Sequence, residues 1–318
     1  MRDYILRRLL LIPPIMLGVS LLTFLTFQLI AGDIVDLKCG FTCPPETREA
    51  LREELGLKRP LYEQYGDWLW GVVRGDLGDS IATGVPVTTE LGRRLPITAE
   101  LMVLTIIFSL LLGVPVGVLS AIRPGSLLDS FARFVSVLWL SIPSFYLGVL
   151  VITFSFSWFG WVPPQFGAEG HRSFFEDPWA NLQEFIFPSL VLAAASAAVI
   201  MRLVRSSLLE VMRQDYIRTA WSKGLRERGV VWRHAFKNAV IPVVTILGLE
   251  IGGLLGGTVI VESIFALNGI GFYLLTSVIL RDLFVVQSLV LFFAATYVIA
   301  NLLVDVSYAW LDPRIRYG

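Results

Sequence analysis

Six long runs of apolar residues alternate with polar segments along this chain. A run of about 18 or more residues with few charges is long enough to cross a bilayer as a helix. The fourth run contains Pro188 near its start, and the fifth is apolar except for Glu250. We therefore expect six membrane-spanning helices. Their ranges are Leu9–Ile30, Leu101–Ile122, Phe134–Ala168, Phe185–Met201, Ala239–Val261 and Leu283–Val304.

Two of these runs need a further decision. The first could be a cleaved signal peptide, but it exceeds the usual apolar region of a signal, and Ile30-Ala31-Gly32 is a poor cleavage site. We expect it to be retained as a helix. The third run is longer than one span needs, and Pro163-Pro164 is expected to mark where it leaves the helix.

The charges indicate how the spans are oriented. The chain is 55% hydrophobic and 16% charged, which is unlike a soluble domain. Its 26 basic and 26 acidic residues cancel, so the global charge implies no nucleic-acid partner. The side that holds the N-terminus carries 16 Lys and Arg residues, against 10 on the other side, most of them in one long segment that counts less. We expect a multi-pass protein of the cytoplasmic (inner) membrane with both termini in the cytoplasm.

The external segment after the first span is expected to be helical. Helices are predicted over Glu46–Leu55, Leu61–Val73 and Val87–Leu95, the last ending at Pro96. The second is rich in Tyr and Trp, which favour the membrane surface. The same aromatic side chains also suit a platform for an external partner, and the two interpretations are compatible.

The two cysteines, Cys39 and Cys43, both fall in this external segment. Their spacing suits a small disulfide loop in an oxidising compartment. A zinc site is disfavoured because His171 and His234 are far away in sequence and on opposite sides of the membrane. Two free thiols are the alternative.

The polar, basic segment Asp215–Pro242 lies between the fourth and fifth spans. A helix is expected over Met212–Ser222, with Gly224 in the position of a C-terminal cap. A second helix is expected over Val230–Val240, and Pro242 should kink its continuation into the membrane. The result is a helix–turn–helix at the cytoplasmic surface.

Two explanations fit this loop. Its basic side chains alone could serve positive-inside topology and phospholipid contact. That explanation needs neither Gly224 nor an expected apolar knob formed by Tyr216, Ala220 and Trp221. A structured loop of this kind is typical of a site that holds a partner.

The loop also resembles a known element. The letters RTA at 218–220, Gly224 and the pair IP at 241–242 resemble the Glu-Ala-Ala loop of binding-protein-dependent ABC importer permeases, which docks into the ATPase. Arg-Thr replaces Glu-Ala, and the gap before the proline is longer than the general pattern. Both departures are similar to the peptide and nickel branch, where R-x-A-x-x-K-G-L and R-H-x-x-x-N-A-x-I-P recur, here at Arg218–Leu225 and Arg233–Pro242.

The resemblance extends over nearly the whole chain. Two departures are Leu267-Asn268, where a Trp-Pro gate pair is common, and Glu250, where a neutral residue is expected. They concern substrate detail rather than class. The similar segments include Leu51–Tyr65, Arg74–Ser80, Arg93–Leu101, Ser141–Gly148 and Gly252–Phe265.

The resemblance implies an all-α polytopic membrane protein with six transmembrane helices and the type I ABC importer permease fold. Residues 1–97 would form the first helix plus the helical external segment, and residues 98–318 a five-helix core with its docking loop at about 208–238. Implied partners are a second homologous permease subunit, two cytoplasmic ATPases, an external solute-binding protein and membrane lipid. ATP and Mg would be bound by the ATPases, and no cofactor, metal or catalytic residue is expected in this chain.

Two sets of site residues follow. An intramembrane carboxylate such as Glu250 is by default a candidate for function, and glycines on the same span serve either close packing or a pathway. The expected pathway or gate residues are Glu250, Gly253, Gly257, Glu262, Phe265 and Asn268. The expected ATPase-docking residues are Asp215, Tyr216, Arg218, Ala220, Trp221, Lys223 and Gly224.

The expected function is import of short peptides. None of the four lysines follows a glycine, so the chain has no phosphate-binding loop for ATP. Other solutes of the branch, namely a nickel chelate, glutathione or an oligosaccharide, stay open as alternatives. A secondary transporter or a membrane scaffold is a further alternative, although inverted repeats are absent from the sequence.

Overall fold

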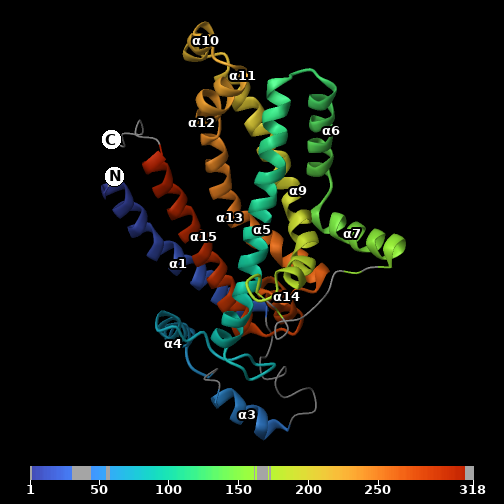
Figure 1. Ribbon diagram of the computed structural model, residues 1–318. Coiled ribbons are helices and arrows are strands. Elements are labelled where there is room, and N and C mark those ends of the chain that lie inside the picture. Colours follow the sequence, from blue (N-terminus) through green and yellow to red (C-terminus); the bar gives the residue numbers. More distant parts are fainter. Residues whose placement is uncertain are drawn as a thin grey trace. The chain divides into compact units, whose positions relative to one another are not determined.

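The computed structural model describes residues 2–30, 44–54, 58–160, 162, 171 and 173–311 (Figure 1). The regular elements within these ranges are helices, which confirms the all-α class. A single isolated β-bridge pairs Asp79 with Pro86 in the described residues. Two compact units form: residues 1–96 with 268–299, and residues 97–267 with 300–316. The division into 1–97 and 98–318 stays a prediction.

Five helices are long and apolar enough to cross a membrane, and a sixth span results if one bent pair counts as a single span. This agrees with the six runs of the sequence and makes the chain a multi-pass membrane protein. The five helices are α1 (Arg2–Ile30), α5 (Val87–Ile122), α9 (Pro178–Val211), α13 (Ile241–Phe265) and α15 (Leu283–Leu311).

The third run does not form one continuous helix, so that detail of the prediction is wrong. It is divided into α6 (Leu127–Ser141) and α7 (Ser144–Phe159), which meet at 102°. Ile142, between them, is extended with ψ 120°. Pro143 causes this, because a proline disfavours the helical conformation of the residue before it. Pro163-Pro164, the expected end of the run, lies outside the described residues.

The expected helix end at Pro96 is also wrong, because α5 continues through this proline. A proline inside a helix costs about 3 kcal/mol or more. Ile97 follows it directly and Leu101 lies one turn further on, and both are buried in the core of the second unit. Burying two such side chains contributes roughly 1.5–3 kcal/mol each, which offsets that cost.

In the first unit, α3 (Pro45–Glu54) and α4 (Leu61–Val73) confirm the two helices expected in the external segment. Their connection to α5 is fixed through Asp282, just before α15. The Oδ2 atom of Asp282 accepts hydrogen bonds from Ser80 Oγ at 2.5 Å and from the Ala82 N–H at 3.1 Å. Cys39 and Cys43 lie outside the described residues, so their disulfide stays a prediction.

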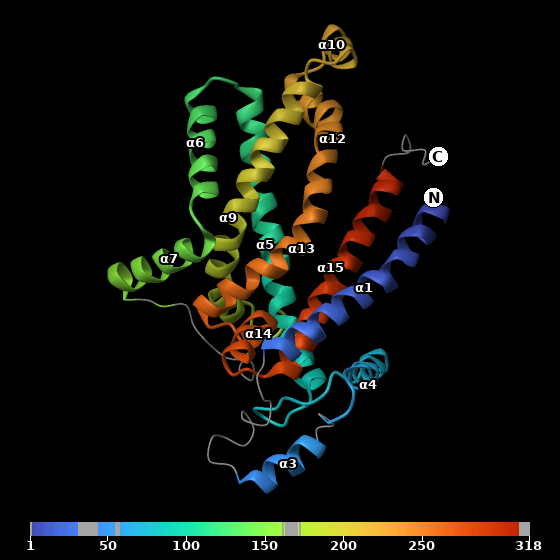
Figure 2. The same ribbon diagram turned by 180° about the vertical axis from the view of Figure 1, so that it is seen from behind.

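In the second unit, α6, α7 and α13 pack against α9 (Figure 2). α5 approaches α9 closely at two glycines spaced four apart. A Cβ added to Gly113 would lie 2.7 Å from the Ala197 carbonyl oxygen, and one on Gly117 would lie 2.7 Å from that of Met201. Glycine at this spacing lets two helix backbones approach closely.

Candidate functional site

A short helix, α10 (Asp215–Ser222), follows α9 and projects from one end of the second unit (Figure 1). Ile217 is fully buried and Ala220 is 6% exposed. Residues three apart lie on the same face of a helix, and this face packs in a core cluster with Val204 and Leu208 of α9. The base of α10 is therefore part of the protein core rather than a free loop.

Tyr216 and Trp221 lie on either side of this buried face, and each is about two-fifths exposed, at 43% and 41%. Arg218 forms a solvent-exposed ion pair with Asp215, with 3.6 Å between the nitrogen and the oxygen. The expected knob of three residues is thus reduced to two aromatic side chains, because Ala220 points into the core.

Gly224 ends this helix in the conformation that its position suggested. Its φ is +73°, in the left-handed region that costs glycine little and other residues more. Lys223 is the capping residue, and the Leu225 N–H reaches back to the Ala220 carbonyl oxygen at 3.4 Å. The backbone therefore reverses sharply beside the exposed aromatic side chains.

The second half of the loop is helical, as expected, but with an unusual turn. Three short pieces follow each other: α11 (Glu227–Gly229), the π-helix η1 (Val230–Ala235) and α12 (Phe236–Ala239). Asn238 Nδ2 donates a hydrogen bond to the Tyr216 hydroxyl at 2.8 Å, which joins the two halves of the loop. The helix breaks after α12, so Pro242 lies in the first turn of α13 instead of kinking a continuous helix.

A buried ion pair lies near the same end of the second unit. Arg205 of α9 binds Asp129 of α6 with two hydrogen bonds, Nε to Oδ1 at 2.7 Å and a second nitrogen to Oδ2 at 3.0 Å. Ser120 of α5 also donates to the Asp129 carboxylate, and the Gly125 N–H donates at 2.9 Å. Asp129 is fully buried, so this cluster ties three helices together through charge-assisted hydrogen bonds.

Five of the six expected pathway residues lie on α13 in the second unit. Glu250 is half-buried beside Ser196 of α9, and its Oε2 atom has no hydrogen-bond partner among the described residues. Glu262 is fully buried and accepts a hydrogen bond from Thr98 at 2.7 Å. Phe265 is buried as well, within the core.

The remaining expected pathway residues differ in their surroundings. A Cβ on Gly257 would lie 3.4 Å from Leu192, whereas Gly253 has no such neighbour within 4 Å. Asn268 belongs to the first unit, where its Oδ1 accepts a weak hydrogen bond from Arg94 at 3.4 Å. The structure thus gathers Glu250, Gly253 and Gly257 along one helix and places Asn268 separately.

An acidic pair surrounds His171, in the polar segment before α9. Its Nε2 lies 3.4 Å from Glu100, and its Nδ1 lies 3.8 Å from Glu184, too far for a hydrogen bond but close enough for ionic attraction. The Glu184 carboxylate raises the pKa of His171, and partial burial opposes this shift. The neighbouring carboxylates therefore stabilise the positive form of His171 relative to the unfolded chain.

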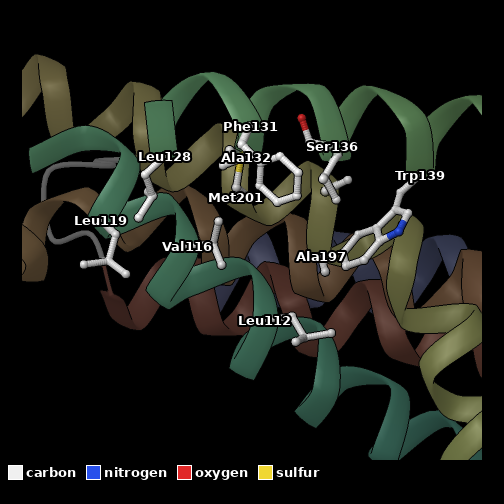
Figure 3. A pocket seen from close by; sticks show the side chains of 12 residues that line it. Leu112, Val116, Leu119, Leu128, Phe131, Ala132, Ser136, Trp139, Ala197 and Met201 are labelled. Carbon is white, nitrogen blue, oxygen red and sulfur yellow. The ribbon is translucent and has the colours of Figure 1, made fainter. Parts of the chain in front are cut away.

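A cavity of about 250 Å³ lies between α5, α6 and α9. Figure 3 shows Leu112 and Val116 of α5 on one side and Phe131 and Trp139 of α6 on the other. No charged residue lines it, and Ser136 is the only hydroxyl residue in its lining. Its lining offers no partners for a charged group, which costs much free energy to bury unpaired.

The membrane-spanning helices and the projecting helical loop define an integral-membrane transport component. Two family models match the chain: "Binding-protein-dependent transport system inner membrane component" over residues 113–317, and the N-terminal model of the same membrane component over residues 1–102. The chain belongs to this family of inner-membrane permeases.

Relatives with assigned names cover the full chain. The chain is 39% identical to the oligopeptide transport system permease protein AppB of Bacillus subtilis over 318 residues, covering 100% of both. It is 39% identical to the dipeptide transport system permease protein DppB of Escherichia coli over 339 residues, covering 100% of this chain and 99% of that protein. A DppB protein of Alkalihalophilus pseudofirmus is 36% identical over 334 residues, covering 100% of both.

Sequence reasoning missed two parts of this site. Ile217 anchors α10 in the core, and its spacing of three from Ala220 was the signal that could have identified it. The Asp129–Arg205 pair had no such signal, because the two residues are 76 positions apart in the sequence.

Proposed function

We propose that this permease forms half of a translocation pathway for short peptides. An external binding protein delivers the peptide, and separate ATPase subunits supply the energy. The names of the relatives support the solute class, since the chain matches peptide permeases along its whole length. The observation that carries the proposed coupling is α10, which exposes Tyr216 and Trp221 above a buried base.

The packing suggests how movement of the ATPases reaches the pathway. Ile217 and Ala220 share one core cluster with α9 residues and with Val243 near the start of α13. A close-packed core moves as a unit, so a pull on α10 would displace α9 and α13 together. Arg205 and Asp129 extend the connection from α9 to α6. The mechanism is alternating access, driven from the docking loop.

The remaining partners follow from this role. A second, similar permease would supply the other half of the pathway, so a heterodimer is expected. ATP and Mg would be bound by the two ATPases, because this chain carries no phosphate-binding loop. The termini and the docking loop would face the cytoplasm, consistent with the count of Lys and Arg residues.

Peptide uptake by proteoliposomes tests the proposal. The complete complex, with its external binding protein, should accumulate a labelled dipeptide or tetrapeptide only when ATP is enclosed with the ATPases. Omitting the binding protein should abolish uptake. Uptake of a nickel chelate, glutathione or an oligosaccharide in place of any peptide would overturn the solute class, and uptake without ATP would overturn the class of transporter.

Glu250 is proposed to line the pathway and to influence which peptides pass. Its carboxylate is half-buried beside α9, and one oxygen lacks a partner among the described residues. Glu250→Gln keeps the shape of the side chain and removes its charge. The ratio of uptake rates for cationic and anionic peptides should shift in this variant while assembly of the complex is unchanged. An identical ratio would leave only a structural role for Glu250.

A further inference from the structure

The external helix α4 packs against the outer part of α1. The Tyr65 hydroxyl lies 2.8 Å from Ser20 Oγ, a hydrogen bond that either group can donate. Phe24 contacts two rings of α4, with centroid distances of 5.4 Å to Tyr65 and 6.3 Å to Trp68. One face of α4 is therefore fixed to a membrane-spanning helix.

These contacts determine the depth of α4. The apolar run of α1 is Leu9–Ile30, and both Ser20 and Phe24 lie inside it. Phe24 precedes the end of that run by six residues, about 9 Å at the helical rise of 1.5 Å per residue. A side chain of α4 thus reaches into the depth of the bilayer, so the helix lies at the membrane–water boundary.

The free side of α4 carries large apolar groups. Tyr62 is 75% exposed, Val73 is 70% exposed and Trp70 is 58% exposed. At the helical spacing, Tyr62 and Val73 lie next to the face that packs on α1, and Trp70 lies farther round, beside Glu63. Asp67 and Gln64 lie beyond them, on the polar side of the helix. Asp67 forms an exposed ion pair with Arg59 at 2.8 Å, as expected for a side in water. The helix therefore has a packed, an exposed apolar and a polar sector.

We propose that α4 lies in the outer interface of the bilayer, with Tyr62, Trp70 and Val73 inserted among lipid headgroups and the upper acyl chains. Trp and Tyr favour this region because their rings are apolar and their polar atoms stay hydrated. The membrane-spanning helix on which α4 packs also exposes apolar side chains at this level, including Leu21, Leu22 and Leu25.

The positive charge of Arg74, at the end of α4, also suits contact with lipid headgroups. The Arg74 guanidinium lies 4.6 Å from the centre of the Trp70 ring. A long basic side chain beside an interfacial aromatic can cover the ring while its charged end reaches phosphate or water. The interfacial helix would fix how deeply the outer end of α1 is placed and how the external segment leaves the membrane.

Site-directed spin labelling of the assembled complex in phospholipid vesicles tests this inference. Single labels are introduced at Tyr62→Cys, Trp70→Cys and Val73→Cys in a Cys39→Ser, Cys43→Ser background, with Gln64→Cys and Asp67→Cys as controls on the polar sector. Collisions with oxygen, which concentrates in lipid, are compared with collisions with a water-soluble nickel chelate.

The first three labels should be several-fold more accessible to oxygen, relative to the nickel chelate, than the two controls. Equal accessibility to the nickel chelate at all five positions would place the aromatic sector in water and overturn the inference. Loss of accessibility to both reagents only after the external binding protein is added would assign the surface to that protein, which also overturns it. Quenching of Trp70 fluorescence by brominated lipid, measured as the difference from Trp70→Phe, provides a check without any cysteine.

Discussion

At the scale of single residues, the buried Asp129 carboxylate accepts hydrogen bonds from three other residues, and its substitution should reduce stability. Asp129→Asn removes the charge that Arg205 binds and leaves the guanidinium without its partner. Breaking a buried ion pair on one side destabilises a protein by about 3–5 kcal/mol. The midpoint of thermal unfolding of the purified protein in nanodiscs should fall clearly.

The matched control is Asp67→Asn, which removes the solvent-exposed pair with Arg59. Exposed pairs contribute little to stability, so its midpoint should match that of the unchanged protein. Equal midpoints for Asp129→Asn and Asp67→Asn would show that the buried cluster does not stabilise the second unit.

His171 gives stability a dependence on pH. Glu184 raises the pKa of His171, partial burial opposes the shift, and Glu100 and Glu176 add to it. A group whose pKa is raised on folding stabilises the protein fully below its unfolded-state pKa, about 6.5 for histidine. That contribution is lost as pH rises through the folded-state pKa.

The midpoint difference between the unchanged protein and His171→Gln should therefore be largest near pH 6 and should shrink toward pH 9. Thermal unfolding of both proteins over this range measures it, with His234→Gln as the control for removing a histidine elsewhere. A difference that is constant with pH would contradict the electrostatic explanation.

At the scale of elements, the close contact of α5 with α9 is fixed by glycine. Gly117→Leu would place a Cβ 2.7 Å from a backbone oxygen and 2.8 Å from the Val204 Cβ, neither of which can rotate away. Overpacking typically costs about 1–3 kcal/mol, and forced separation of two helices adds to this. The level of folded protein in the membrane should drop.

Gly92→Leu is the matched control, because it lies on the same helix and has no atom within 4 Å of an added Cβ. Membrane fractionation followed by limited proteolysis compares the two variants. Comparable resistance to protease would show that α5 and α9 separate without loss of structure.

The existence of these elements could be predicted from the sequence better than their ends could. Apolar runs identify spans because every span needs a similar length in lipid. The effect of a proline on a helix, in contrast, differs from one position to another. Pro143 ends a helix in the middle of an apolar run, whereas α5 continues through Pro96, where buried neighbours offset the lost hydrogen bond. Such differences depend on tertiary packing, which no local pattern contains.

At the scale of the whole molecule, the helical loop between α9 and α13 could be predicted, but its packing contacts could not. The position of Gly224 predicted the end of α10, because a C-terminal cap depends on the local backbone and not on distant contacts. Which side of α10 is buried depended on α9 and η1, so Ala220 was wrongly placed on the exposed knob. The roles of the pathway residues on α13 stay predictions, because a single chain holds one half of the proposed pathway.

The proposed function requires that separate cytoplasmic ATPase subunits drive this permease through α10. Peptide-stimulated ATP hydrolysis by the assembled complex tests it in Gly224→Val, which forces a β-branched residue to φ +73° and displaces Trp221. Gly229→Val is the control, because Gly229 has a helical φ of −67° and open space around it. Stimulated hydrolysis should fall severalfold in Gly224→Val and stay near normal in Gly229→Val, with equal membrane insertion of both. Unchanged stimulation in Gly224→Val would contradict the claim.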